Sequence, residues 1–452
     1  MGLVAYDDGD LKHACQLLED LTGDDLVTPR ILKEVAGWLD DNEQFEKARR
    51  WYIRAIDSHH PDFAPKAMYN LGNLESEQGN AYQARCWYRQ VIDSHHPDVV
   101  AQAMYNLGNL ESERGNGPEA RRLFIKAIES GNSDTAPRAM AHLGYLESEW
   151  GDFAQARRWY TQASDSGHPD AAPIAMSNLG KLEFDLGDID QARSWYTRAS
   201  DSGCPDVAPS AMFVLGGLES GLGDIGQARH WYTRAAESGH IDQAPRAMCN
   251  LGSVEMERGD TGQARRWFTE AIDSGHLVAA PKAMLNLGKL ESELGNIDEA
   301  RFLYIRAIDS GHPDDSPRAM VMLGLLESQQ GDPHQARAWY IRAIDSGHLD
   351  DAASAMLLLG VLEFDRGDRD QARRWYTRAI DSGHVDTVPM ALVALADLES
   401  VQGNAKKARR LYATAGGSGD PGIAGMIQRA SRELDQREEE HRRAQDAIRR
   451  GY

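Results

Sequence analysis

Histidine recurs once every 36 residues along most of the chain, which makes it the first candidate for chemistry. Histidine can ligate a metal ion or titrate near neutral pH. A metal ion needs ligands within about 2.0–2.1 Å, whereas equivalent residues of neighbouring helices lie roughly 8–10 Å apart. We therefore predict turn residues, with a pH-sensitive ladder as the alternative. The set is His60, His96, His168, His240, His276, His312, His348 and His384.

A repeated Asp-Ser pair, as at Asp57 and Ser58, could be taken for a base and its nucleophile. Its repetition argues against this, because a catalytic site needs one convergence of different groups rather than one copy per repeat. The sequence also contains no HExxH, GxxxxGK[ST] or GxSxG motif. We predict no catalytic residue, no metal site, no cofactor and no enzymatic activity.

Glutamate and arginine recur with the same period, as at Glu75 and Arg85. These residues predict a ladder of Glu–Arg pairs, within or between the repeating units. Exposed pairs contribute only about 0–1 kcal/mol each, so we expect the ladder to set packing register more than stability. The recurring tryptophans, such as Trp87, are expected to pack between units, with a stacking platform for a ligand as the alternative.

Composition limits the class of protein and its partners. A net charge of −21 disfavours nucleic acid, since Lys and Arg supply most of that affinity. The charge keeps a long array soluble and could attract a basic protein or peptide. No run of about 18 apolar residues is present, so we expect no membrane span. The four isolated cysteines and the absence of a secretory signal predict a reduced, cytoplasmic location.

Each 36-residue unit is predicted to hold two helices, which residues 65–100 illustrate. Apolar residues follow helical spacing on both sides of Gly79, which can adopt the left-handed conformation that ends a helix. Asn80 or its Asn and Asp equivalents are placed to cap the second helix. Gly72 lies inside the first helix, where it predicts a close approach between helices.

This pattern resembles the tetratricopeptide repeat family, and its Leu-Gly and Trp-Tyr pairs resemble the related Sel-like repeats. Glu75 departs from the family, which usually has Tyr there, and the turn between units is two residues longer than in the common 34-residue repeat. The residues that match the family pattern are Met68, Leu71, Gly72, Ala84, Tyr88 and Val91.

The resemblance implies an all-α fold, an α-solenoid of stacked antiparallel helical hairpins in a right-handed superhelix. We count about eleven 36-residue repeats. Residues 1–27 are predicted to form a partial N-terminal repeat or cap, and residues 28–424 the solenoid. Residues 425–452 are strongly charged and are predicted to form a capping or projecting helix.

The resemblance also implies that the first helices line a concave groove for an extended peptide or a partner protein. An amide can donate to a peptide carbonyl and accept from an N–H. A spaced set of asparagines could thus bind a peptide backbone, like the asparagine ladders of O-linked N-acetylglucosamine transferases and kinesin light chains. The alternative is a set of solvated polar residues. The predicted peptide-binding residues are Asn70, Asn106, Asn178, Asn250, Asn286, Lys66, Tyr69 and Tyr105.

Later repeats are apolar at the comparable positions, as at Met322 and Leu358. These residues either form an exposed interaction strip or belong to the core. Two functions remain open at this stage. The first is a non-enzymatic scaffold that binds a peptide or partner protein in its groove. The second is a structural unit that forms homo-oligomers through its terminal repeats.

Overall fold

The computed structural model describes residues 28–417 and 419–449 of the 452-residue chain. Within these ranges the regular elements are all helical, which confirms the predicted all-α fold class. The predicted N-terminal part, residues 1–27, lies outside the described residues. None of the described helices combines the length and apolar composition needed to span a membrane.

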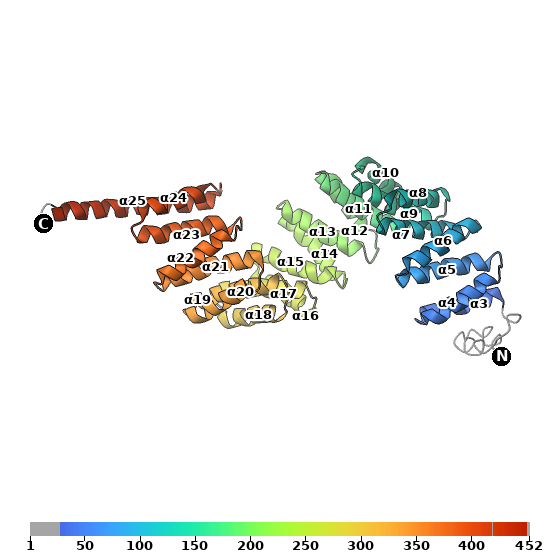
Figure 1. Cartoon of the computed structure of the whole chain (residues 1–452), viewed down its shortest axis with the longest axis horizontal. Coiled ribbons are helices and arrows are strands. Elements are labelled where there is room, and N and C mark those ends of the chain that lie inside the picture. Colours follow the sequence, from blue (N-terminus) through green and yellow to red (C-terminus); the bar gives the residue numbers. More distant parts are fainter. Residues whose placement is uncertain (1–27, 418, 450–452) are drawn as a thin grey trace. The chain divides into compact units, whose positions relative to one another are not determined.

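The helices fall into two units, the first ending at Leu218 and the second beginning at Glu219. In the first unit each odd-numbered helix packs against the next even-numbered one, and each hairpin stacks on the following hairpin. Figure 1 labels these helices. They are α3 (Pro29–Asp41), α4 (Phe45–Asp57), α5 (Phe63–Glu77), α6 (Ala81–Ser94), α7 (Val100–Glu113), α8 (Gly117–Glu129), α9 (Thr135–Glu149), α10 (Phe153–Asp165), α11 (Ala171–Asp185) and α12 (Ile189–Ser200).

The second unit repeats the same hairpin stacking from α15 to α24. Helix α13 (Ala208–Gly221) spans the boundary between the units. The helices after it are α14 (Ile225–Glu237), α15 (Gln243–Glu257), α16 (Thr261–Asp273), α17 (Ala279–Glu293), α18 (Ile297–Asp309), α19 (Asp315–Gln329), α20 (Pro333–Asp345), α21 (Leu349–Asp365), α22 (Arg369–Asp381), α23 (Thr387–Val401), α24 (Ala405–Gly416) and α25 (Pro421–Arg449).

Two kinds of glycine shape each hairpin. Gly79 has a φ of 75° and ends the first helix, as its position predicted. Gly72 lies inside α5, where a Cβ would come within 2.7 Å of the ring of Tyr88 on α6. The predicted close approach is therefore confirmed, and it lets Tyr88 be almost fully buried. His59 and His95 adopt the same left-handed conformation as the turn glycines that occupy their position in later repeats.

The residue that precedes each second helix behaves in two ways. Asp152 accepts a hydrogen bond from the backbone N–H of Gln155, the helix cap that the sequence predicted. The prediction is wrong for Asn80, whose side chain makes no cap bond and instead donates to Glu75 Oε2 at 2.8 Å. An amide can donate to the buried carboxylate, whereas an aspartate would repel it and turns to the backbone instead. Asn116, Asn296 and Asn404 donate to glutamates in the same way.

The predicted Glu–Arg ladder is confirmed, and it joins neighbouring repeats. In nine pairs, the recurring arginine of a second helix lies 2.5 to 3.2 Å from the glutamate of the next first helix. The glutamates are buried, so these are not the exposed pairs that the sequence suggested. The pairs are Arg49–Glu75, Arg85–Glu111, Arg121–Glu147, Arg157–Glu183, Arg229–Glu255, Arg265–Glu291, Arg301–Glu327, Arg337–Glu363 and Arg373–Glu399.

The recurring histidines are turn residues, as predicted, and several also link adjacent repeats. Nδ1 of His168 accepts from the backbone N–H groups of Asp170 and Ala171, at 3.2 and 3.1 Å. Its Nε2 lies 3.1 Å from Asp134 Oδ1 of the preceding repeat. Because Nδ1 accepts, Nε2 carries the proton and donates to the carboxylate. The same link joins His96 to Asp62.

Helix α25 starts as a first helix and continues past the stack. Its buried residues Ile423 and Leu434 pack against α23 and α24. Asp435 takes the place of the ladder glutamate and pairs with Arg409 at 2.7 Å. Arg432 lies 36 residues after Ala396, at the position that is glycine in the earlier first helices.

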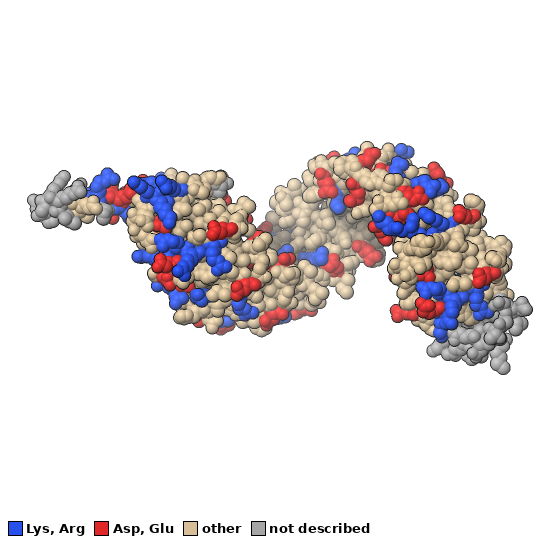
Figure 2. Space-filling view, in the orientation of Figure 1, with Lys and Arg blue, Asp and Glu red and all other residues tan. Residues whose placement is uncertain are grey.

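Charged side chains are interspersed on the face of the molecule that Figure 2 shows. Tryptophans pack between the hairpins as predicted, and arginine side chains cover several of them. The guanidinium of Arg198 lies 4.3 Å from the ring centroid of Trp195, within the range of a cation–π contact.

Candidate functional site

The first helices of the first unit form the surface on which the sequence placed peptide binding. We call the surface of α5, α7, α9 and α11 the first-helix face. Tyr69 and Asn70 lie on α5, Tyr105 and Asn106 on α7, and Asn178 on α11. The other two predicted asparagines, on α15 and α17, belong to the second unit.

The predicted asparagines are half-buried, and several already use their donors within the protein. Nδ2 of Asn106 donates to Asn73 Oδ1 at 2.9 Å and to Tyr69 Oη at 3.3 Å. Tyr88 also donates to Asn73 Oδ1, at 2.8 Å. Burial raises the pKa of Tyr88 above its usual range, so its hydroxyl stays a neutral donor. The donor of Asn106 is thus occupied by a contact between repeats.

The two asparagines of the second unit are engaged in a similar way. Asn250 donates to Tyr232 Oη at 3.2 Å, and Asn286 donates to Ser253 Oγ at 3.4 Å. Asn178 lines a cavity beside His142 and Tyr145. The structure therefore does not present five equivalent free amides, and the candidate site lies in the first unit.

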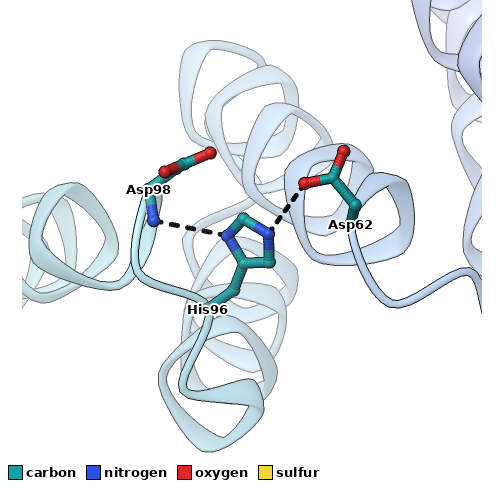
Figure 3. Close-up of side chains that lie close together, drawn as sticks. All are labelled: Asp62, His96 and Asp98. Carbon is teal, nitrogen blue, oxygen red and sulfur yellow. Dashed lines mark hydrogen bonds and ion pairs between the residues drawn. The ribbon is translucent and has the colours of Figure 1, made fainter.

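Lys66 lies at one end of α5, where two aspartates hold it. Its Nζ is 3.0 Å from Asp62 Oδ1 and 2.8 Å from Asp98 Oδ2, which raises the pKa of the Lys66 ammonium. Asp62, His96 and Asp98 lie close enough together that their ligand atoms could surround a metal ion (Figure 3). The Lys66 ammonium already pairs with both carboxylates, and Nδ1 of His96 accepts from the Asp98 N–H at 3.3 Å. This cluster is well explained as a link between repeats.

Two adjoining cavities open on the first-helix face. One has a volume of about 340 Å³ and is polar, with Asn73, Asn106, Glu77 and Glu113 in its wall. The other, of about 390 Å³, has Ala141, Tyr145 and Ile174 in its wall. Asn109 and Glu113 line both cavities.

The Asn109 side chain, which lines both cavities, has an unsatisfied acceptor. Its Oδ1 is inaccessible to solvent and has no hydrogen-bond partner among the described residues. A buried acceptor without a partner costs about 1–3 kcal/mol, so a donor that reaches it is favoured. In the sequence Asn109 lies 36 residues after Asn73, and nothing in that spacing predicts its unsatisfied oxygen.

The second cavity exists because one repeat has a small residue. Ala141 occupies the position of Tyr105 and Tyr69 in the two preceding repeats, 36 and 72 residues earlier. Tyr145 and Ile174 border the space, and their side chains remain 53% and 44% exposed. Aligning the repeats by their period could have found Ala141, but not the hole that it leaves.

The apolar residues of the later repeats divide between the two predicted alternatives. Val321 and Val393 are buried core residues. Met322 and Leu358 are half-buried and pack against core clusters, while Val361 is 39% exposed. These residues for the most part fill space between helices. A cavity of about 420 Å³ lies at the α25 junction, among residues of α23, α24 and α25.

Family comparison agrees with the repeats seen in the structure. A family model described as tetratricopeptide repeat matches residues 213–283, 249–317, 285–347 and 321–387. A second model, described as the pre-mRNA-splicing factor Syf1/CRNKL1 C-terminal HAT repeat, matches residues 8–214. The predicted tetratricopeptide repeats are thus confirmed for residues 213–387. A search of curated proteins gives no match.

Three solved structures illustrate the range of similar folds. PilF of Pseudomonas aeruginosa is 20% identical, with a TM-score of 0.40 over 46% of this chain and 91% of its own. BtubC from P. vanneervenii is 17% identical, with a TM-score of 0.39 over 44% and 90%. The protective antigen c5321 of uropathogenic Escherichia coli, which displays an SLR fold, is 20% identical, with a TM-score of 0.43 over 95% and 94%. These values are too low to transfer a property to this chain.

Proposed function

We propose that this protein is a non-enzymatic scaffold that binds an extended peptide segment of a partner protein on the first-helix face. Proteins with these repeats generally act as protein-interaction scaffolds. The observation that carries the proposal is the buried, unpartnered Oδ1 of Asn109 between two adjoining cavities. We also propose a cytoplasmic location, which the isolated cysteines favour.

The asparagines contribute chiefly as acceptors in this proposal. The Nδ2 of Asn106 is engaged with Asn73 and Tyr69, which orients the side chain and leaves its oxygen for a peptide N–H. Asn109 and Asn178 supply further amide groups around the second cavity. Backbone contacts of this kind hold a segment without selecting its side chains, so the cavities supply the selectivity.

The proposal is tested by panning a phage-displayed library of random 12-residue peptides on the immobilised full chain. Affinity for a selected, fluorescein-labelled peptide is then measured by fluorescence anisotropy. We expect the N106A/N109A/N178A variant to lose at least tenfold in affinity, because three amide groups of the face are removed. The matched variant N250A/N286A, in the second unit, should bind as the unaltered chain does.

Failure to select any peptide would contradict the proposal. So would equal loss in the two variants, which would show that the first-helix face of the first unit is not the site. Circular dichroism and urea unfolding of both variants provide the check that the helices still form.

The alternative is self-assembly through the terminal repeats. At the C-terminal end, the apolar residues of the last hairpin are covered by Ile423 and Leu434 of α25, which leaves a charged surface beyond them. This arrangement resembles the polar cap that repeat arrays need. Light scattering coupled to size exclusion, over a hundredfold range of concentration, tests the alternative, and a constant monomer mass would contradict it.

A further inference from the structure

The chemistry of the first-helix face also points to the kind of segment it takes. Resting on the proposed function, we infer that the segment carries a lysine or arginine side chain and an apolar side chain three residues apart. The basic side chain occupies the polar cavity and the apolar side chain occupies the neighbouring one.

A row of carboxylates borders the face. Each first helix from α3 to α11 has an acidic residue as its last residue, and all five are exposed. None of them forms an ion pair within residues 28–417 or 419–449, in contrast to the ladder glutamates. The carboxylate row consists of Asp41, Glu77, Glu113, Glu149 and Asp185.

The position of this row is electrostatically unfavourable for the free protein. The C-terminal end of a helix carries a partial negative charge, which repels a carboxylate and attracts a cation. Neighbouring members of the row lie on adjacent parallel helices, so they add to one another's potential. The bound cation of a partner would relieve both effects, which makes a basic segment the complementary ligand.

The polar cavity brings two members of the row to one space. Glu77 of α5 and Glu113 of α7 both line it, together with Asn73, Ser76 and Asn106. Carboxylate, hydroxyl and amide oxygens are acceptors, and they match the several N–H donors of a lysine or arginine head group. No lysine or arginine lines this cavity.

The neighbouring cavity fits an apolar side chain. Ala141, Ile174 and the ring of Tyr145 form much of its wall. Its volume of about 390 Å³ is ample for a leucine or an aromatic ring. Exposed apolar wall of this kind gains free energy when a side chain removes it from water.

The spacing of the two side chains follows from the spacing of the repeats. Neighbouring packed helices lie roughly 8–10 Å apart. A polyproline II segment has three residues per turn and a rise of about 3.1 Å, so every third side chain points the same way at about 9 Å intervals. A segment in this conformation places residues i and i+3 over successive repeats. The segment can run in either direction along the face, so either the basic or the apolar residue can come first.

The test repeats the library selection with the full chain and two variants. The unaltered chain should enrich peptides with a basic and an apolar residue three positions apart. The variant E77Q/E113Q should lose the basic preference and keep the apolar one. The variant A141Y, which restores the tyrosine of the preceding repeats, fills the second cavity and should lose only the apolar preference.

Affinity measurements give the size of the effect. A selected peptide should bind E77Q/E113Q about tenfold more weakly, and its binding to the unaltered chain should weaken as salt is raised from 50 to 500 mM. The matched variant E257Q/E293Q, at the equivalent positions of α15 and α17, should retain full affinity.

The outcomes separate this inference from the proposed function. Selected peptides that still require Asn106, Asn109 and Asn178 but show no basic preference would overturn the inference and leave peptide binding intact. Selection of no peptide would overturn both. Equal loss in E77Q/E113Q and E257Q/E293Q would show a general charge effect and would also overturn the inference.

Discussion

The first helices among α5–α11 and among α19–α23 have the same place in the repeat, but they carry different residues at their surface positions. At the position of Tyr69 and Ala141, the later repeats have the core residues Val321 and Val393. At the position of Asn106, one of them has Met322. The earlier repeats thus present amides and open cavities, while the later ones mostly fill the same space with aliphatic side chains.

The comparison shows which features build the array and which are free to vary. Ladder pairs, turn glycines and the glycine–tyrosine contact occur in both regions. The first-helix surface varies because it is not needed to join one hairpin to the next. A binding site can therefore arise where one residue is made smaller, as at Ala141, without loss of the stack.

A second difference lies in the turns between repeats. Four of the five such turns of the second unit carry an aliphatic side chain that is more than 80% exposed, where the first unit mostly has proline; the fifth has Pro313. Isolated exposed aliphatic residues are common and need no partner. These residues are Ile241, Leu277, Leu349 and Val385, against Pro61, Pro97, Pro169 and Pro205.

The largest effect is expected from removing a ladder arginine, and the comparison is whether this costs the same stability in the two regions. R157A and R301A should each lower the free energy of unfolding by about 3 kcal/mol, because each leaves a buried glutamate without its cation. The control R85A should cost less, since Asn116 still donates to Glu111 at 2.9 Å. Urea denaturation gives the values. A clear difference between R157A and R301A would contradict a shared ladder.

A reciprocal exchange would test the difference between the two faces. M322N should destabilise the protein by about 1–2 kcal/mol, because it places an amide among apolar side chains. N106M loses its bonds to Tyr69 and Asn73 but should cost less than about 1 kcal/mol. N106M should also weaken peptide binding, which M322N should leave unchanged. Equal costs and equal binding would show that the faces are interchangeable.

The smallest effect concerns pH. The Arg265 guanidinium lowers the pKa of Glu291 below its ordinary 4.5. As the pH falls through 4.5 the unfolded chain takes up this proton before the folded one does, so stability present above that pH is lost below it. Unfolding free energies between pH 7 and 3 should therefore fall less steeply for E291Q.

The carboxylate row supplies the contrasting control for that measurement. E113Q removes an exposed charge from the end of α7, where the helix dipole opposes it. This change should leave stability at pH 7 unchanged or raise it by up to about 1 kcal/mol. A loss of stability would show that Glu113 has a structural partner in the folded protein.

Much of the hairpin could be predicted from the sequence because its causes are local. The role of Gly72 followed from its place inside a helix, and the structure identifies Tyr88 as the ring that needs the space. The Glu–Arg ladder followed from its period, although its direction between repeats did not. The sequence did not show that Asn80 donates to Glu75, because a residue at this position can either cap the second helix or bond to that glutamate.

The candidate site was predicted less completely. The period placed Asn70, Asn106 and Asn178 on first helices, and the structure agrees. It did not show that the Asn106 donor is already used, or that Asn109 Oδ1 lacks a hydrogen-bond partner among the residues that the structure describes. Such facts depend on which side chains of neighbouring repeats meet.

The sequence by itself determined the repeat, the two helices in each unit and the residues that hold one hairpin to the next. Helix periodicity and turn glycines act over a few residues, and repetition carries their effect along the chain. Only the tertiary structure decided which polar groups are satisfied and where Ala141 leaves space. Cavities and unpaired acceptors are what remains after side chains from several helices have packed, and no single segment specifies that remainder.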